Sequence, residues 1–370
     1  MSQSGSFNIR VFVILVAALA LAGTLFGQVG AQEAPYPEPG EAAEAGVAWL
    51  LESHQNDDGG FTSFSSGAND APSDVTGTVD ALLAIGSVDG DISGPLSYLE
   101  DNIDDVVAFA AQDGSTAGKL VWALEVVGEP SRSFGGEDFV AILSEHYDPA
   151  TGQYRTETAF QQSLAIIGST LADETVPEEA KVWLVEQQDT EGDTAGSWGD
   201  GFGTVGNADS TALALMALSQ AGQPAGSEAI AGALTFLSRS QLETAGWEYG
   251  PGFGENANST ALVIQALDAA GEEIAAEDTD WAVDGRTPME ALLSWQAANG
   301  AFQADFGEGR ADDFFSTVQA LPALAVAQDG VLEDAPTIAG GDSPLPFILL
   351  GVLAVLLLGS YLFYRFNSQP

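Results

Sequence analysis

The feature that most constrains this sequence is a two-helix unit that recurs along most of the chain. Its second helix is apolar on every side: residues 211–218 read Thr-Ala-Leu-Ala-Leu-Met-Ala-Leu and carry no charge. Its first helix is amphipathic, as in residues 181–188, where the charged side chains share one side. Thr211 and its counterpart Thr260 are 49 residues apart, which lies within the range of helical-repeat periods.

Six copies of the unit can be aligned on a threonine near the start of each second helix. These markers are Thr78, Thr116, Thr158, Thr211, Thr260 and Thr317. A helix that is apolar all round has to be buried all round, and a single-layer solenoid would leave both its faces exposed. An inner ring of apolar helices wrapped by the amphipathic helices solves this problem. The sequence therefore predicts an all-α fold, an (α/α)6 toroid of about twelve helices over residues 41–328; an open helical array is the alternative.

Local residue choice supports these helix positions. Capping side chains stand where the second helices should begin, and we expect N-caps at Ser115, at Asp209 or Ser210, and at Asn258 or Ser259. Glycines stand where these helices should end, and a left-handed residue is favoured there. They are Gly86, Gly128, Gly168, Gly222 and Gly271.

The N-terminal segment has the pattern of an export signal. Arg10 precedes an uncharged apolar run, and small residues up to Ala31 offer a cleavage site. We therefore expect residues 1–31 to be a signal peptide, with an uncleaved signal anchor as the alternative, and residues 32–40 to be a linker.

The C-terminal segment predicts a membrane anchor. Residues 345–364 contain no charge and are long enough, as a helix, to cross a hydrocarbon core of about 30 Å. Residues 329–344 would be a linker and residues 365–370 a cytoplasmic tail. The prediction is an exported, single-pass protein of the cell membrane whose domain lies outside the cell.

Charge and cysteine content exclude several kinds of function. The chain has 54 acidic and nine basic residues, a formal net charge of −45, which repels nucleic acid and anionic headgroups. Adaptation to high salt, cation binding in acidic loops and plain solubility remain open as causes of this acidity. Because there is no cysteine, there can be no thiol nucleophile and no thiolate metal site. We expect a monomer without a metal centre.

Three strings carry a family resemblance. Three stretches each combine a predicted helix that ends in Gln with a glycine one or two positions before an aromatic residue. They are residues 183–188 with 196–198, residues 236–241 with 246–247, and residues 49–61. They resemble the QW repeat of squalene cyclases and prenyltransferases, of the terpenoid cyclase and protein prenyltransferase toroid superfamily. The resemblance implies the α-α toroid fold. It also implies structural roles, tying loops to neighbouring helices, for Gln55, Gln188, Gln241 and Trp247.

The resemblance is less specific for activity, since one fold hosts many functions. Squalene cyclases protonate an alkene with a DxDD-type acid; the nearest string here is Asn207-Ala-Asp-Ser, in which Ser210 replaces the second acid. Asp209 is therefore interpreted as a helix cap. Prenyltransferases bind zinc through Asp, Cys and His, and that site is absent from a chain without cysteine. Thioester domains also need Cys, so that branch is excluded. We expect His54 and His146 at the surface. The missing acid pair and zinc site together favour a protein that is not an enzyme.

The class of protein that remains is a toroid that binds a ligand or a partner without catalysis. The long loops 188–209 and 241–258 would stand at the ring mouth, where acids and aromatics suit a sugar, a cobamide or a cation such as calcium. No resident cofactor is implied. The prediction is a cell-surface domain that holds a small ligand or a surface protein at the ring mouth; a terpene cyclase or prenyltransferase-like enzyme and a structural surface scaffold are the alternatives. The candidate ligand residues are Trp198, Asp200, Asp209, Tyr249, Asn258, Asp305 and Asp313.

Overall fold

The computed structural model describes residues 36–63, 67–201, 206–305 and 307–329. The chain divides into two units, Met1–Pro37 and Glu38–Pro370, and the account below concerns the second unit by itself. The predicted signal peptide, C-terminal linker, membrane segment and tail lie outside the described residues. Within the described part, no helix has the length and apolar character needed to cross a membrane.

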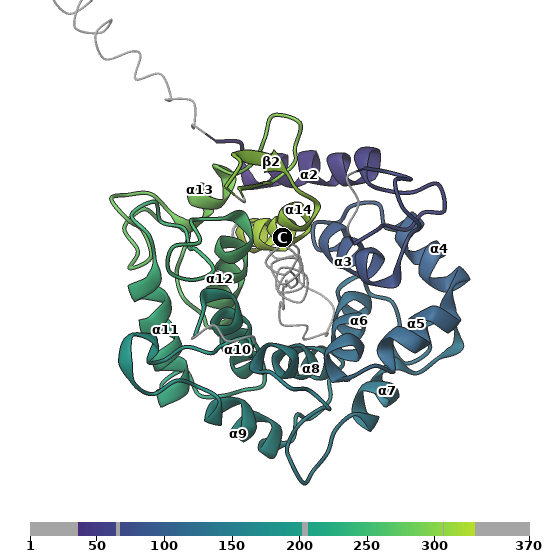
Figure 1. The fold of residues 1–370 in the computed structure, drawn as a ribbon, viewed down its shortest axis with the longest axis horizontal. Helices are drawn as coiled ribbons and strands as arrows, with labels where there is room; N and C mark the ends of the chain where they lie inside the picture. Colours follow the sequence, from purple (N-terminus) through teal and green to yellow (C-terminus); the bar gives the residue numbers. More distant parts are fainter. Residues whose placement is uncertain (1–35, 64–66, 202–205, 306, 330–370) are drawn as a thin grey trace, which may run out of the picture. The chain divides into compact units, whose positions relative to one another are not determined.

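Two concentric rings of helices make up the described part of this unit (Figure 1). The inner ring consists of α3 (Val75–Gly86), α6 (Gly114–Val126), α8 (Ala159–Leu171), α10 (Ala208–Gln220), α12 (Ala257–Ala269) and α14 (Phe314–Asp329). The outer ring consists of α2 (Pro39–Ser53), α4 (Ser93–Asp101), α5 (Ile103–Ala110), α7 (Phe139–Glu145), α9 (Glu178–Glu186), α11 (Glu228–Ser240) and α13 (Pro288–Leu293). The all-α class and the α-α toroid arrangement agree with the sequence prediction.

The inner helices are buried in the way their composition requires. Every residue from Ala208 to Leu218 of α10 is buried, and so are nearly all residues of the first three turns of α12. Close approach helps to pack this ring: a Cβ at Gly168 of α8 would lie 2.3 Å from the carbonyl oxygen of Gly118 in α6. Only glycine allows two helix backbones to come so near.

The last unit closes against the first. The Gln296 side-chain amide donates a hydrogen bond of 2.7 Å to the Ala42 carbonyl in α2. Gly300 has a φ of 95°, and a Cβ there would lie 2.2 Å from the Ala45 carbonyl oxygen. α14 also packs against both α2 and α3. The described helices therefore form a closed ring and not an open array.

The structure differs from the prediction in a few elements. Where the repeat calls for one outer helix, the structure has two, α4 and α5, which meet at Asn102. The Asn102 side-chain amide donates 2.8 Å to the Tyr98 carbonyl and so competes with the helical pattern. A short antiparallel hairpin, β1 (Gln303–Asp305) with β2 (Arg310–Asp312), was not expected. Two single 3-10 turns, η1 (Phe134–Gly136) and η2 (Gly192–Thr194), lie in loops.

The predicted N-caps were wrong by two or three residues. The side chains that accept a hydrogen bond from the first turn belong to Asp113 for α6, Asn207 for α10 and Asn256 for α12. Each helix therefore begins two or three residues earlier than expected, because Asn and Asp reach the N3 amide as well as Ser does. This shift places Asp209 inside the first turn of α10.

The predicted glycine stops were partly correct. Gly128, Gly222 and Gly271 have φ values of 73°, 78° and 79° directly after their helices, the left-handed conformation that ends a helix. Gly86 is the last residue of α3 but is not left-handed, and Gly168 lies within α8.

Candidate functional site

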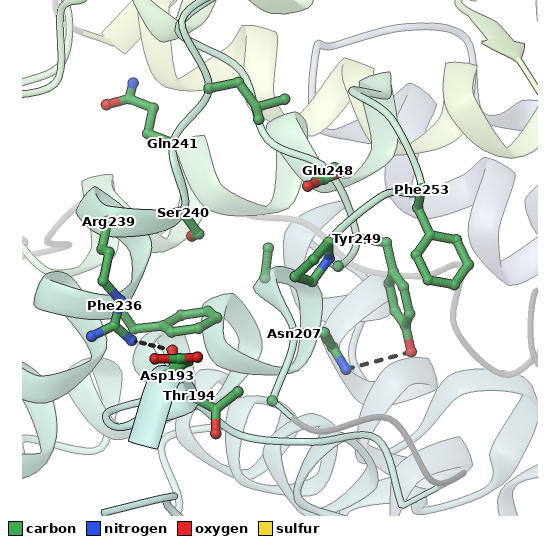
Figure 2. A pocket seen from close by; sticks show the side chains of 15 residues that line it. Asp193, Thr194, Asn207, Phe236, Arg239, Ser240, Gln241, Glu248, Tyr249 and Phe253 are labelled. Carbon is green, nitrogen blue, oxygen red and sulfur yellow. Dashed lines mark hydrogen bonds between the residues drawn. The ribbon is translucent and has the colours of Figure 1, made fainter. Parts of the chain in front are cut away.

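A cleft of about 730 Å³ lies between the loops of the two most regular units (Figure 2). Its lining comes from η2, the start of α10, the C-terminal turn of α11 and the loop that leads into α12. These are the loops for which the sequence predicted a ligand site.

Aromatic side chains form the apolar part of the cleft. Phe236 of α11 and Tyr249 are buried, whereas Phe253 is 52 % exposed, one of two large apolar side chains exposed among the described residues. The Tyr249 and Phe253 rings meet edge to face with centroids 5.4 Å apart. The Glu248 carboxylate supports the Phe253 loop, accepting from the backbone amides of Gly252 at 3.0 Å and Gly254 at 2.9 Å.

Arg239 ties the other wall of the cleft together. Its guanidinium donates to the backbone carbonyls of Asp193 at 2.7 Å and Ala195 at 3.2 Å. It also lies 5.6 Å from the centre of the Phe236 ring, a cation–π distance. The side chains of Asp193 and Glu248 place carboxylates at the rim (Figure 2).

A buried polar cluster lies behind the cleft. The Tyr249 hydroxyl donates to the carboxylate of Asp200, and the Asn207 amide donates to the Tyr249 oxygen at 3.4 Å. Asn207 also caps α10 by accepting from the Ser210 amide at 2.8 Å. Tyr249 thus connects the cleft with the interior of the ring.

Asp209 is the most perturbed acid of this cluster. Burial raises the pKa of its carboxyl from 3.8 to about 6; the Ser259 hydroxyl of α12 opposes this rise and the charge of Asp200 adds to it. Both acids are only 3 % exposed. Asp209 was expected to cap α10, which is wrong, because Asn207 makes that hydrogen bond. Burial of this carboxyl therefore favours its protonated form.

The other predicted ligand residues bond within the protein. Trp198 is fully buried and its indole N–H donates 2.7 Å to the Leu184 carbonyl. Asn258 accepts from the Ser316 hydroxyl at 2.7 Å. Asp313 accepts from the Ser316 amide at 2.7 Å, and burial raises its pKa. Asp305 accepts from two glycine amides inside the β1–β2 hairpin. Of the seven predicted residues, Tyr249 lines the cleft, and Asp200 and Asp209 belong to the buried cluster behind it.

The repeat glutamines bridge loops and helices. Gln188 donates to the carbonyls of Gly196 at 2.8 Å and of Ala229, in the next outer helix, at 2.9 Å. Gln241 donates in the same way to Ala245 at 3.0 Å and Trp281 at 2.8 Å.

Gln55 of the first unit and Trp247 of the fifth unit make similar hydrogen bonds within their own units. Gln55 donates to the Gly59 carbonyl at 3.0 Å. The Trp247 indole N–H donates 2.8 Å to the Leu237 carbonyl, which fixes the loop against its own outer helix.

Sequence reasoning missed Phe236 and Arg239 as cleft residues. Both lie in the string that carries the repeat, three residues apart on one side of α11, and that spacing was the available signal. The two histidines were expected at the surface, which is wrong. His54 lies between Trp49 and Phe314, and burial lowers its pKa. His146 is buried and hydrogen-bonds the Ala110 carbonyl at 2.8 Å.

The described part of this region contains no cluster of metal-ligating side chains. Across the described residues, no three His, Asp or Glu side chains come together in a way that could hold an ion.

Comparisons with solved structures establish the fold. The type II terpene cyclase MstE from Scytonema superposes with a TM-score of 0.55 at 17 % identity, covering 79 % of this chain and 99 % of that one. A protein from Actinoplanes gives 0.54 at 16 %, covering 79 % and 100 %. A glycosidase gives 0.50 at 13 %, covering 79 % and 96 %. No protein-family model and no curated protein matches the sequence.

These likenesses show that the chain has the α-α toroid fold of the terpenoid cyclases. At such identities the fold alone is shared, and a fold by itself does not assign a reaction.

Proposed function

We propose that the toroid binds a small neutral or cationic ligand that has an apolar ring face, with a neutral sugar as the best match. The observation that carries this proposal is the cleft with Phe236, Tyr249 and Phe253 in its walls. Its volume of about 730 Å³ falls in the range of roughly 300–1,000 Å³ usual for small-ligand pockets. An exposed aromatic ring offers a surface on which a sugar ring stacks.

Charge narrows the ligand class. With a net charge of −45, the protein repels anionic ligands, and the carboxylates of Asp193 and Glu248 at the rim add to that effect. The same carboxylates accept hydrogen bonds from hydroxyl groups or pair with a cation. The predicted export and membrane anchor would present this cleft outside the cell.

The test is a thermal-shift screen of the full chain with neutral glycans, cobamides and divalent metals. A ligand present at 100 times its dissociation constant should stabilise the protein by about 2.7 kcal/mol. Phe253→Ala should weaken binding at least tenfold, because it removes the exposed ring. Val182→Ala, which truncates the other exposed apolar side chain at 45 % exposure on α9, is the control and should bind normally. Equal affinity of the Phe253→Ala and unaltered proteins would contradict the proposal.

A second candidate function is acid-catalysed cyclisation of a polyene. The observation that favours it is Asp209, a buried carboxyl with a pKa of about 6 in a fold shared with a terpene cyclase. A neutral carboxylic acid can donate a proton to an alkene if its neighbours stabilise the carboxylate that remains. Ser210 stands where the squalene-cyclase motif has its second acid, which makes this the weaker candidate. Incubation with squalene or prenyl diphosphates should give no cyclised product. A product that disappears in Asp209→Asn would instead favour the enzyme.

A further inference from the structure

Three polar side chains occupy the same place in three neighbouring inner helices. Counted from the capping residues Asp74, Asp113 and Asp313, the sixth position holds Asp80 in α3, Lys119 in α6 and Gln319 in α14. Counted from Thr158, Asn207 and Asn256, the other inner helices hold leucine there: Leu164, Leu213 and Leu262. One arc of the inner ring is therefore polar at this level and the other arc is apolar.

An ion pair shows which way this position faces. Asp80 and Lys119 pair with each other across α3 and α6. Equivalent positions in a ring of parallel helices face the same way relative to the ring. Side chains that pointed from one helix towards the next would all point in the same sense round the ring and would not meet. Side chains that pointed away from the ring axis would diverge. The threonines two positions earlier face the other way, since Thr78 and Thr317 accept from the Phe61 and Phe302 amides in the loops that follow the outer helices. The sixth position lies about 200° further round the helix and so faces the ring interior.

Gln319 extends the arc on the other side of Asp80. α14 packs beside α3 (Figure 1), so the same symmetry turns Gln319 towards the axis. Trp122 lies three residues beyond Lys119 on the same face of α6. The arc thus comprises Asp80, Lys119, Trp122 and Gln319.

The hydrogen-bonding capacity of this arc is largely unused. Gln319 is 1 % exposed, and neither atom of its amide has a partner among the described residues. The Trp122 indole N–H is likewise buried and unpartnered there. Asp80 and Lys119 form an ion pair, and within the same part of the chain their charged atoms have no further hydrogen-bond partner. Burying polar groups without partners is unfavourable, so several of them on equivalent faces of neighbouring inner helices indicate an external partner.

We propose that this axial arc binds a zwitterionic ligand of the α-amino-acid class. The ligand's ammonium group donates to the Asp80 carboxylate and the Gln319 carbonyl. Its carboxylate accepts from the Lys119 ammonium, the Gln319 amide and the Trp122 indole. A zwitterion matches because Asp80 and Lys119 supply one charge of each sign. Because the ligand has no net charge, the acidic surface does not repel it as it repels anions.

The experiment measures binding of glycine, L-alanine and L-glutamine to the full chain by saturation-transfer NMR, with glycerol as the uncharged control. We expect saturable binding of at least one amino acid and none of glycerol. Gln319→Leu should weaken that binding at least tenfold. The double variant Asp80→Leu with Lys119→Leu should abolish it. All three substitutions introduce leucine, the residue found at this position in the apolar arc. Replacing a buried ion pair by apolar residues is often tolerated.

Controls separate this site from the cleft and from a folding defect. Gln187→Leu, at an exposed glutamine of the outer ring, and Phe253→Ala in the cleft should both bind amino acids normally. Should the leucine variants lose their helical circular dichroism, Trp122→Phe removes the indole N–H alone and should weaken binding several-fold. Failure of all three amino acids to bind the unaltered protein would overturn the proposal, as would normal binding by folded Gln319→Leu. In either case the arc holds ordered water only.

Discussion

At the scale of single residues, the first-turn position of α10 decides what Asp209 does. The string Asn207-Ala-Asp-Ser contains three residues able to cap a helix, and propensity ranks them almost equally. The backbone begins α10 at Ala208, so Asn207 becomes the cap. Asp209 then turns into the ring, towards Asp200 and Ser259. Sequence reasoning identified the candidate acid but assigned it the wrong role.

The raised pKa of Asp209 predicts a stability effect with a definite sign. Since its folded-state pKa of about 6 lies above 3.8, the folded state binds the proton more tightly than the unfolded state. The associated stabilisation is complete below pH 3.8 and is lost as the pH rises through 6. Asp209→Asn cannot titrate, so it should match the unaltered protein near pH 4. At pH 8 it should be more stable, by up to about 3 kcal/mol.

Urea unfolding of both proteins at pH 4, 6 and 8 checks this expectation. Asp193→Asn, which removes an exposed carboxylate at the cleft rim, is the control. A difference between Asp209→Asn and the unaltered protein that does not change with pH would contradict the assignment.

At the scale of elements, the inner helices define the fold because they are apolar on all sides. The composition of residues 211–218 predicted burial on every face, and the structure confirms it. The outer helices were harder to place, since an Asn such as Asn102 can break a helix by bonding its own backbone. Such a break depends on local hydrogen bonds that no periodicity reveals.

A charge introduced in the inner ring should prevent folding. In Leu213→Asp the carboxylate would be buried without a partner, at a cost of several kcal/mol against a total stability of about 5–15 kcal/mol. Val182→Asp makes the same change on the outer face of α9, where the side chain is exposed, and should be tolerated. Far-UV circular dichroism distinguishes the outcomes: a helical spectrum is expected for Val182→Asp only. A helical Leu213→Asp variant with unchanged thermal stability would be inconsistent with an all-round buried helix.

At the scale of the whole molecule, ring closure and charge act against each other. Closure brings residues from both ends of the described chain together, as in the Gln296–Ala42 hydrogen bond. The net charge of −45 opposes compaction through self-repulsion, which is screened over a Debye length of about 10 Å at 0.1 M salt.

The protein should therefore lose thermal stability at low salt and regain it with sodium chloride. Differential scanning calorimetry between 10 mM and 2 M sodium chloride measures this, and micromolar calcium chloride provides the contrast. If calcium restored the stability while molar sodium chloride did not, binding of cations by acidic loops would explain the acidity better than general screening.

The sequence by itself determined the all-α class, the number of units and the inner and outer roles of the helices. These follow from hydrophobic periodicity, which is a local property of the chain. It also located the two loops that enclose the cleft, because their length and composition are visible along the chain.

Only the tertiary structure decided which residues meet. Arg239 bonds the Asp193 carbonyl, and Tyr249 bonds Asp200, because separate units are packed side by side. The same holds for Asp80 and Lys119, which are far apart in sequence and pair only because α3 and α6 are neighbours in a closed ring. Burial and pairing depend on these distant contacts, and no local pattern in the sequence encodes them.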